Sequence, residues 1–310
     1  MTESATLTAP GRETELRTRM AGVFVPISTP FADDEAVDYG ALAFNVERYA
    51  ASGVLGYLAL GSNGENRSLT EDEKYGVLEC IVKHKAPHQV VMAGATYDAQ
   101  RDTESFLRRA ADLGADFGLV LSPGYFRKLM TEEVLFRYFS TVAESSPLPL
   151  ILYNAPGFCG VTLTPALVGR LAEHPRIVGM KDSASSGIEN FLQIESDGFH
   201  VLAGSANFLF AAMMGGSIGG TVSLANSFPE VALELFRYGQ ARDEQRGIPF
   251  QERVTRINQA ISGPFGPSGV KAAMNLGGFK GGIPRRPLLP LSAAQVEQLR
   301  LLFQKEGLVQ

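Results

Sequence analysis

Cysteine, histidine and long apolar runs are all scarce in this 310-residue sequence. The only cysteines, Cys80 and Cys159, are too few for a disulfide framework or a closed cysteine-rich zinc site, and they favour a reducing, cytoplasmic compartment. The net charge of −5 gives no electrostatic reason to expect nucleic acid or an anionic membrane as a partner. No apolar run approaches the roughly 20 residues that a membrane span needs. With 45% hydrophobic residues, the composition is that of a globular protein with a large core.

A secretion signal is also missing from the amino-terminal segment. The first 20 residues contain three arginines, but three glutamates accompany them and no apolar stretch follows. We therefore predict a short disordered tail over residues 1–20.

Short apolar runs alternate with segments of helical spacing along most of the chain. Eight runs are predicted to form strands, at residues 21–28, 53–61, 89–95, 117–123, 148–156, 176–183, 200–205 and 219–226. They are apolar throughout, as expected for a parallel sheet that is covered on both faces. Helices predicted between them include residues 38–52, 70–85, 101–114 and 131–145. Eight repeats of strand and helix predict a (β/α)₈ TIM barrel.

An open, doubly wound sheet is the alternative architecture. It would be favoured by a glycine fingerprint after the first strand, and the sequence there, "VPISTPFADD", has none. Two helix starts are predicted from their caps. Thr70 with Glu73 has the spacing of a capping box, and Thr131 is spaced to cap the amide of Val134.

After residue 226 the pattern changes to helices only. These helices are predicted at residues 229–245, 250–261, 269–277 and 293–307, and the first of them would close the barrel. We predict a catalytic barrel over residues 21–240 and a C-terminal helical region over residues 241–310.

One predicted strand ends in a lysine. The run "RIVGMKDS" passes from apolar residues into Lys181, at the end of the barrel where active sites lie. Burial disfavours an ammonium group, so such a lysine extends to water, pairs with an acid or is kept for its neutral amine. Asp182 is an awkward partner because adjacent strand residues point to opposite faces. A neutral amine can attack a ketone to form a Schiff base, whose iminium accepts electrons when the neighbouring carbon–carbon bond breaks.

Two other strand ends supply groups that such a reaction needs. Tyr153 is a candidate general acid or base, and backbone N–H groups of the loop "GSNGE" (61–65) could hold a carboxylate beside the carbonyl. Each feature alone has a plainer explanation. A lysine at a strand end is more often solvated or ion-paired, a tyrosine is more often a packed ring, and a glycine-rich pentapeptide is most often a turn. Their coincidence at one barrel mouth favours catalysis.

A competing motif, "GGSIG" (215–219), matches the nucleophile elbow of serine hydrolases. An elbow needs a strand before it and a helix after it, whereas Ser217 is predicted between a helix and a strand. The four histidines lie at helix ends, loops or strand starts, away from the predicted mouth: His84, His88, His174 and His200. Because no histidine is predicted at the mouth, the site would lack the usual base for a serine nucleophile and the imidazoles of a zinc-dependent aldolase. We therefore expect no metal and no cofactor.

The motifs "GSNGE", "YNAP", "GMKDS", "LAGS" and "GG…LAN" resemble those of the dihydrodipicolinate synthase and N-acetylneuraminate lyase superfamily of pyruvate-dependent class I aldolases. The resemblance runs from "GVFVPISTPF" to "RPLLPLS", with the motifs in order at the predicted strand ends. It implies that Lys181 is the Schiff-base lysine, Tyr153 the acid/base, and Ser62 with Asn63 the site of the pyruvyl carboxylate. Tyr125 resembles the tyrosine that a neighbouring subunit inserts into the proton relay. A homotetramer, built as a dimer of dimers, is implied as well.

Two departures from the family pattern bear on the second substrate. Synthases of the lysine pathway carry paired threonines where this chain has Ser62 and Asn63. They also carry an arginine, which binds the second substrate's carboxylate, where this chain has Phe158. An apolar ring cannot pair with a carboxylate, which argues against condensation with aspartate semialdehyde.

Within the superfamily, the motifs look most like the 4-hydroxy-2-oxoglutarate aldolase branch. The expected reaction is reversible cleavage of a 2-keto acid, such as 4-hydroxy-2-oxoglutarate or a 2-keto-3-deoxy sugar acid, to pyruvate and an aldehyde. The alternatives are dihydrodipicolinate synthase or N-acetylneuraminate lyase activity. A barrel that binds keto acids without catalysis would be expected to lack Lys181 or Tyr153. The remaining substrate contacts are predicted at Ser183, Gly204, Ser205, Thr221 and Phe158.

Overall fold

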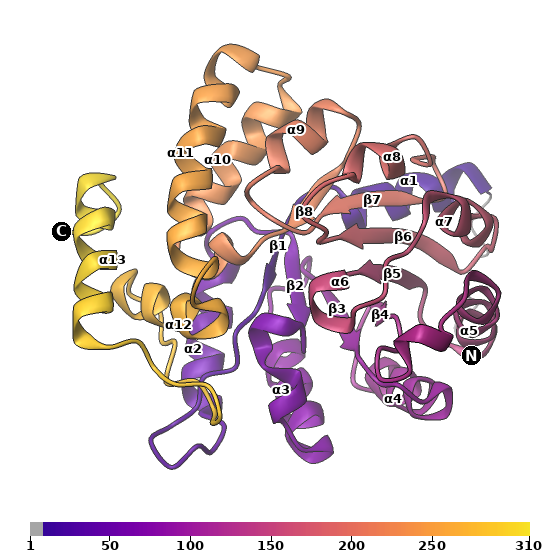
Figure 1. The fold of residues 1–310 in the computed structure, drawn as a ribbon, viewed down its shortest axis with the longest axis horizontal. Helices are drawn as coiled ribbons and strands as arrows, with labels where there is room; N and C mark the ends of the chain where they lie inside the picture. Colours follow the sequence, from indigo (N-terminus) through magenta and orange to yellow (C-terminus); the bar gives the residue numbers. More distant parts are fainter. Residues whose placement is uncertain (1–8) are drawn as a thin grey trace.

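Eight parallel strands close into a barrel in the computed structural model, which describes residues 9–310 (Figure 1). The strands follow one another around the barrel in sequence order, and the last pairs with the first. They are β1 (Val23–Pro26), β2 (Gly56–Ala59), β3 (Val90–Ala95), β4 (Phe117–Leu121), β5 (Leu150–Asn154), β6 (Ile177–Asp182), β7 (His200–Ala203) and β8 (Gly219–Thr221). The predicted TIM barrel is therefore confirmed.

A helix follows each strand and covers the outside of the barrel (Figure 1). These helices are α2 (Tyr39–Ala50), α3 (Glu71–His84), α4 (Gln100–Asp112), α5 (Glu132–Ser145), α7 (Pro165–Ala172), α8 (Ile188–Leu192), α9 (Leu209–Met214) and α10 (Pro229–Gln240). Both predicted caps are confirmed. Thr70 and Glu73 form a capping box at the start of α3, and the Thr131 side chain accepts the Val134 N–H at the start of α5.

The strands are buried along their whole length because the barrel has two apolar surfaces. Outward-facing residues pack against the helices in one large cluster, and a smaller cluster fills the barrel interior. Phe24, Leu58 and Ile151 belong to the interior cluster, and so does Tyr153 at its upper end. This double burial explains why the strand sequences lack an alternation of apolar and polar residues.

Strand β8 is shorter than predicted, because residues Ser223–Asn226 form a 3₁₀ turn, η4. The Asn226 side chain accepts the Ser28 N–H at 3.0 Å and donates to the Pro26 carbonyl at 3.0 Å. The Asn226 carbonyl also accepts the Tyr49 hydroxyl at 2.6 Å. These bonds tie the turn to the end of β1, so the chain leaves the sheet directly after Thr221.

A helix, α1 (Ala9–Met20), occupies most of the segment that was predicted to be a disordered tail. The prediction was wrong for residues 9–20, because contacts of Met20 and Arg19 with the barrel stabilise a helix there. The Met20 side chain is fully buried in the cluster that fills the barrel interior. Arg19 forms an ion pair with Asp116 and lies over the Phe117 ring. Residues 1–8 lie outside the described part of the chain.

Three helices follow the barrel: α11 (Glu244–Ser262), α12 (Gly266–Leu276) and α13 (Ala293–Lys305). Helix α11 begins at Glu244 rather than at residue 250, because the Asp243 side chain caps it by accepting the Arg246 N–H. Helix α13 lies farthest from the strands, with α12 between it and the barrel (Figure 1). The segment between α12 and α13 returns to the mouth of the barrel, where Arg285 donates its backbone N–H to Glu65 at 3.0 Å.

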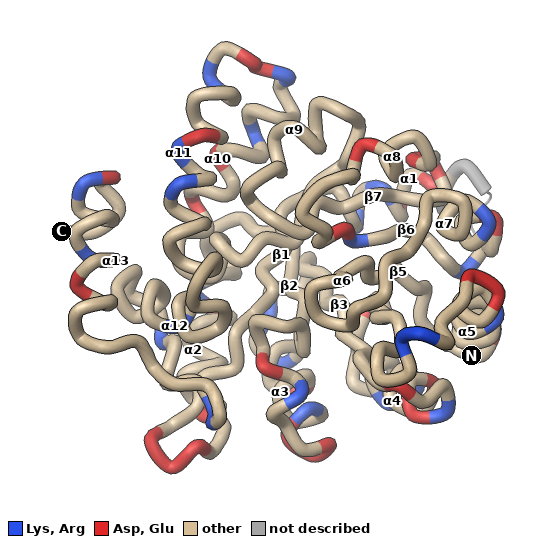
Figure 2. The backbone as a smooth tube through the Cα atoms, in the orientation of Figure 1, with Lys and Arg blue, Asp and Glu red and all other residues tan. Residues whose placement is uncertain are grey.

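Charged residues lie mainly on the outer helices and their loops, with both signs interleaved along the helices (Figure 2). Over residues 9–310, no helix is both long and apolar enough to cross a membrane.

Gly179 in β6 gives a test of how tightly the barrel is packed. A Cβ atom at this position would lie 2.4 Å from the His200 carbonyl oxygen and 2.9 Å from the Met20 methyl carbon. We expect Gly179→Ala to lower the free energy of unfolding by about 1–3 kcal/mol, because overpacking must displace the backbone of β7. Chemical denaturation measures the change.

Gly169 in α7 is the matched control, since nothing lies within 4 Å of a Cβ built there. Gly169→Ala should stabilise the protein by about 0.5–1 kcal/mol, because alanine favours the helix. Equal effects of the two substitutions would contradict the packing argument.

Candidate active site

A cavity of about 170 Å³ opens at the carboxyl ends of the strands. Eight of the residues that line it were predicted from the sequence: Ser62, Asn63, Tyr153, Phe158, Lys181, Ser183, Gly204 and Thr221. Two further residues, Pro26 and Ser223, complete the lining. Residues from six strand ends therefore line one small space, and four of these strand ends supply polar side chains.

Lys181 and Tyr153 are direct neighbours in this cavity, because the register of β5 and β6 places them opposite each other. Only 4% of Lys181 and 3% of Tyr153 is exposed. The Lys181 Nζ atom lies 4.3 Å from the centre of the Tyr153 ring. Among the described residues, no carboxylate lies within ion-pair distance of this ammonium group. Lys181 is thus a buried amine whose close neighbour is a phenol.

Asp182 does not pair with Lys181, as the alternation of strand residues predicts. Its carboxylate accepts a hydrogen bond from the Asn154 side-chain amide at 2.7 Å and one from the Ala184 N–H at 3.2 Å. Burial raises the pKa of this carboxyl above its usual value. The Asn154–Asp182 bond joins the ends of β5 and β6, so it supports the register that brings Tyr153 and Lys181 together.

The pKa of the Tyr153 phenol lies below its usual value of 10. Burial opposes ionisation, but the neighbouring Lys181 ammonium and then the Ser62 hydroxyl stabilise the phenolate by more than burial destabilises it. A tyrosine of this kind gives up its proton more readily than a tyrosine in water, as a general base must.

The loop "GSNGE" forms a single 3₁₀ turn, η1 (Ser62–Gly64), beside these two residues. The Ser62 Oγ atom lies 3.5 Å from the Tyr153 hydroxyl, and the Asn63 side-chain amide donates to the Ser223 hydroxyl at 2.7 Å. The first N–H groups of a helical turn have no partner inside the turn. The turn therefore offers hydroxyl and amide donors close to the Lys181 amine.

Gly204 follows β7 at a point of close approach. A Cβ atom there would lie 2.0 Å from the Ser183 Oγ atom and 2.4 Å from the Asp182 carbonyl oxygen. Only glycine leaves room for the Ser183 hydroxyl at the cavity wall. The hydroxyls of Ser183 and Thr221 are both buried. That of Ser183 helps to lower the pKa of the Tyr153 phenol, and that of Thr221 has no hydrogen-bond partner among the described residues.

Phe158 lies where the catalytic cavity meets two others. It belongs to the short helix α6 (Pro156–Cys159), and 67% of the residue is exposed. It also lines a cavity of about 350 Å³ that contains Leu121 and Leu288, and another of about 470 Å³ that contains Arg67 and Arg127. Arg67 lines both of these neighbouring cavities, and Ser62 lines both the Lys181 cavity and the first of them.

Two predicted site residues do not line the catalytic cavity of this chain. Tyr125 is 79% exposed and packs edge-on against Phe126, and Ser205 accepts a hydrogen bond from the Asn207 N–H at 3.2 Å. The two residues that the prediction missed are Pro26 and Ser223. Ser223 stands in "SLAN" at the end of the eighth predicted strand, so its position along the chain was available as a signal.

Ser217 has no geometry of a nucleophile. It is buried at the amino-terminal end of β8, on the opposite side of the barrel from the cavity. Its hydroxyl lies 2.7 Å from the Val201 carbonyl oxygen and 2.9 Å from that of Gly219. The motif "GGSIG" is a structural turn here.

Comparison with known proteins agrees with this geometry. The sequence profile described as the dihydrodipicolinate synthetase family matches residues 19–306. The chain belongs to this family. Two of its curated relatives carry the name 4-hydroxy-tetrahydrodipicolinate synthase. The protein from an Exiguobacterium species is 33% identical over 90% of this chain and 95% of its own length. The protein from Xanthomonas axonopodis pv. citri is 34% identical, over 89% and 91% respectively.

Solved structures of the dihydrodipicolinate synthetase family superpose closely. YagE, a prophage protein of this family from E. coli K12 in complex with pyruvate, matches with a TM-score of 0.87 and 29% identity, over 93% of this chain and 99% of YagE. The synthase from Acinetobacter baumannii, also complexed with pyruvate, matches with a TM-score of 0.87 and 29% identity, over 94% of this chain and 100% of its own.

The protein is accordingly a pyruvate-dependent class I aldolase, as the motifs indicated. The relatives' names correspond to the synthase alternative rather than to the 4-hydroxy-2-oxoglutarate aldolase branch. The choice of the second substrate therefore depends on the residues around the cavity.

The pairing of Lys181 with Tyr153 can be tested by titration. In Lys181→Met, burial of the phenol remains but the neighbouring positive charge is lost, so the pKa of Tyr153 should rise above 10. Ultraviolet absorbance of the phenolate, taken as the difference from a Tyr153→Phe protein, follows the titration. Lys280→Met is the control, because Lys280 lies over Phe44 rather than over Tyr153. An unchanged Tyr153 curve in Lys181→Met would contradict the coupling.

Proposed function

We propose that Lys181 is the Schiff-base lysine of a reversible aldol reaction between pyruvate and an aldehyde. The observation that carries the proposal is the buried Lys181 amine beside the Tyr153 phenol, in a cavity that Ser62 and Asn63 also line. The neutral amine attacks the ketone carbon of a 2-keto acid, and loss of water gives the iminium.

Tyr153 moves the proton in the cleavage step. Its phenolate takes the proton from the 4-hydroxyl, the C3–C4 bond breaks, and the aldehyde leaves as the bond electrons pass into the iminium to form an enamine. The phenol then returns a proton to C3, and water releases pyruvate from Lys181. Because its pKa is lowered, the Tyr153 group can both take up the proton of the 4-hydroxyl and return a proton to C3.

Ser62 and Asn63 bind the pyruvyl carboxylate in this proposal. Their turn, η1, lies beside Tyr153, and it presents hydroxyl and amide donors to the cavity. Because the carboxylate is adjacent to the ketone carbon, holding it here would direct that carbon toward the Lys181 amine.

We further propose that a second copy of the chain supplies Tyr125 to the relay, within a homotetramer built as a dimer of dimers. Tyr125 is exposed on its own chain and does not line its own catalytic cavity. A neighbouring cavity of about 350 Å³ reaches Ser62, so it could accept an aromatic side chain from outside. A relay of Tyr125, Ser62 and Tyr153 would connect the site to solvent.

The aldehyde is best explained as a hydroxylated fragment of a 2-keto-3-deoxy sugar acid. Lys181 is the only cationic side chain among the described residues of the catalytic cavity, so a second carboxylate would have no partner inside it. The hydroxyls of Ser183, Thr221 and Ser223, all of which line the cavity, suit a substrate that carries hydroxyl groups. 4-Hydroxy-2-oxoglutarate has a second carboxylate and suits this lining less well.

Synthase activity of the kind named for the relatives is the second candidate. It is favoured by those names and by Arg67 and Arg127, which line a cavity that shares Phe158 with the catalytic cavity. An acidic aldehyde could reach these arginines if the exposed Phe158 ring moved aside.

The Schiff base can be trapped directly. Borohydride added with pyruvate should attach a reduced adduct to Lys181, seen as a mass increase in the peptide that contains it. Lys181→Met should abolish the adduct, because no other amine among residues 9–310 lines the cavity. Tyr153→Phe should retain the adduct but lower turnover by about 10²–10⁴-fold. A folded wild-type protein without adduct would refute the proposal, and an adduct without turnover of any 2-keto acid would indicate a binding protein.

Phe158 provides the test of the second substrate. Pyruvate release should be fastest from 2-keto-3-deoxygluconate or its galacto epimer, compared with 4-hydroxy-2-oxoglutarate and N-acetylneuraminate. Phe158→Arg should raise kcat/KM for 4-hydroxy-2-oxoglutarate by about tenfold or more, because a guanidinium can pair with its distal carboxylate. Phe158→Leu is the control, since it changes the ring without adding charge. Wild-type condensation of pyruvate with aspartate semialdehyde at the highest rate would favour the synthase instead.

A further inference from the structure

Glu65 ends the turn that carries Ser62 and Asn63, and its environment is unusual for a carboxylate. Its backbone is left-handed, with φ of 51°, and it joins η1 to a second 3₁₀ turn, η2 (Asn66–Ser68). A residue other than glycine adopts this conformation only where its surroundings hold it there. Only 1% of the Glu65 side chain is exposed, although the residue lies next to the proposed substrate site.

The C-terminal region supplies both partners of this buried carboxylate. The Lys271 ammonium, on α12, lies 2.5 Å from Glu65 Oε1, and Arg285 donates its backbone N–H to Oε2 at 3.0 Å. Lys271 is as deeply buried as Glu65 and also donates to the Ile283 carbonyl at 2.7 Å. A buried ion pair persists when its geometry is good and its remaining polar atoms are satisfied.

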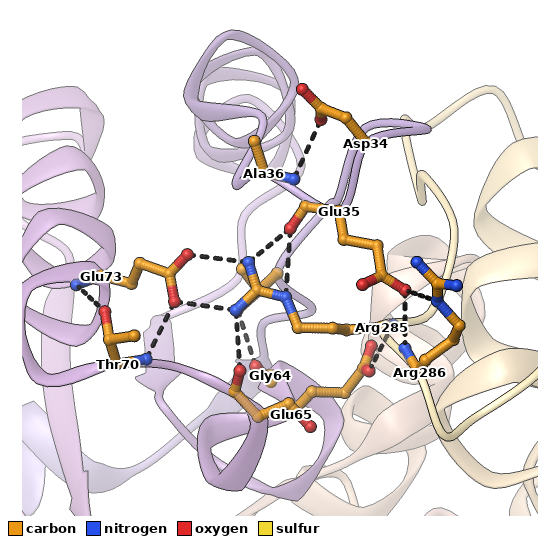
Figure 3. A network of polar contacts seen from close by, with 11 residues as sticks. Asp34, Glu35, Ala36, Gly64, Glu65, Thr70, Glu73, Arg285 and Arg286 are labelled. Carbon is orange, nitrogen blue, oxygen red and sulfur yellow. Dashed lines mark hydrogen bonds and ion pairs between the residues drawn. The ribbon is translucent and has the colours of Figure 1, made fainter.

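Arg285 also binds the chain that follows the turn (Figure 3). Its guanidinium makes two bonds of 2.8 Å to the Glu73 carboxylate, at the start of α3, and one of 2.7 Å to the Ser68 carbonyl at the end of η2. It donates as well to the Glu35 backbone carbonyl at 3.1 Å. This pairing with Arg285 lowers the pKa of Glu73 to about 2.

Phe31 lies between the two cations. The Lys271 Nζ atom and the Arg285 guanidinium carbon are each 4.2 Å from the centre of its ring. The ring is buried, so both cations are held in fixed positions relative to the loop after β1. The C-terminal region therefore contacts residues 65–73 at their start, through Glu65, and farther along, through Ser68 and Glu73.

We propose that Glu65, Lys271 and Arg285 are positioning residues, through which the C-terminal helical region holds the Ser62–Asn63 turn in the geometry that binds the pyruvyl carboxylate. The inference rests on the proposed role of that turn. One peptide bond separates Glu65 from Gly64, and the Glu65 N–H donates to the Ser62 carbonyl at 3.1 Å. A shift of the Glu65 side chain thus moves the carboxylate-binding donors directly. None of the three residues touches the reacting atoms, so their loss acts on binding before it acts on chemistry.

The test measures the pyruvate concentration that gives half-maximal borohydride trapping on Lys181. Lys271→Met should raise this concentration about tenfold, or roughly 1.4 kcal/mol, while the maximal trapping rate changes less than about threefold. The thermal midpoint should fall as well, because the single change leaves Glu65 buried without its partner.

The double variant Glu65→Gln/Lys271→Met separates positioning from stability. Removing both charges should restore much of the thermal midpoint, because neither partner is left uncompensated. The half-maximal pyruvate concentration should nevertheless stay raised, since the ion pair that orients the turn is absent. If the double variant has the wild-type half-maximal concentration, the proposal is wrong. This variant also serves if Lys271→Met does not fold.

Two controls keep the outcomes distinct. Lys280→Met removes a lysine of the same region that contacts Phe44 and not the turn, and it should leave trapping unchanged. Ser62→Ala tests the carboxylate site itself and should also weaken pyruvate binding. If Ser62→Ala weakens binding while the Lys271 variants do not, the positioning proposal fails and the proposed function stands. If Ser62→Ala has no effect, the assignment of the carboxylate site is wrong.

Discussion

The pairing of β5 with β6 is the constraint on which the rest of the site depends. Its register sets Tyr153 opposite Lys181, and the pleat turns the next residue, Asp182, away from the cavity. The Asn154–Asp182 hydrogen bond then joins the two strand ends at the height of the amine. The pKa of the Tyr153 phenol is lowered, because the neighbouring Lys181 ammonium and the Ser62 hydroxyl outweigh the effect of burial.

The remaining strands contribute side chains to a space that the barrel has already defined. Because eight parallel strands end at one rim, residues far apart in sequence, such as Ser62 and Thr221, line the same cavity. The C-terminal region adds an ionic connection to this rim, through the buried pair of Lys271 and Glu65. The helices of this region therefore do more than cover apolar surface. Through Glu65 they also contact the end of the Ser62–Gly64 turn, which lies next to the Lys181 amine.

Much of the fold was predictable because its signals are local. Buried parallel strands read as apolar runs, and the caps at Thr70 and Thr131 follow from residue type and spacing. Helix α1 was not predictable in this way, because its stability comes from burying Met20 against the barrel and pairing Arg19 with Asp116. These contacts join distant parts of the chain, and they leave no periodic pattern that a reading of residues 1–20 could detect.

By itself, the sequence determined the barrel, its eight strands and most of the residues at their mouth, because strand and helix periodicities repeat within short windows. Tertiary structure decided which of those residues share a cavity: it included Ser223 and left out Tyr125 and Ser205. It also decided the partners of Glu65, which lie more than 200 residues away at Lys271 and Arg285. Charge pairing over such a distance has no period in the sequence, and only the closed barrel brings the groups together.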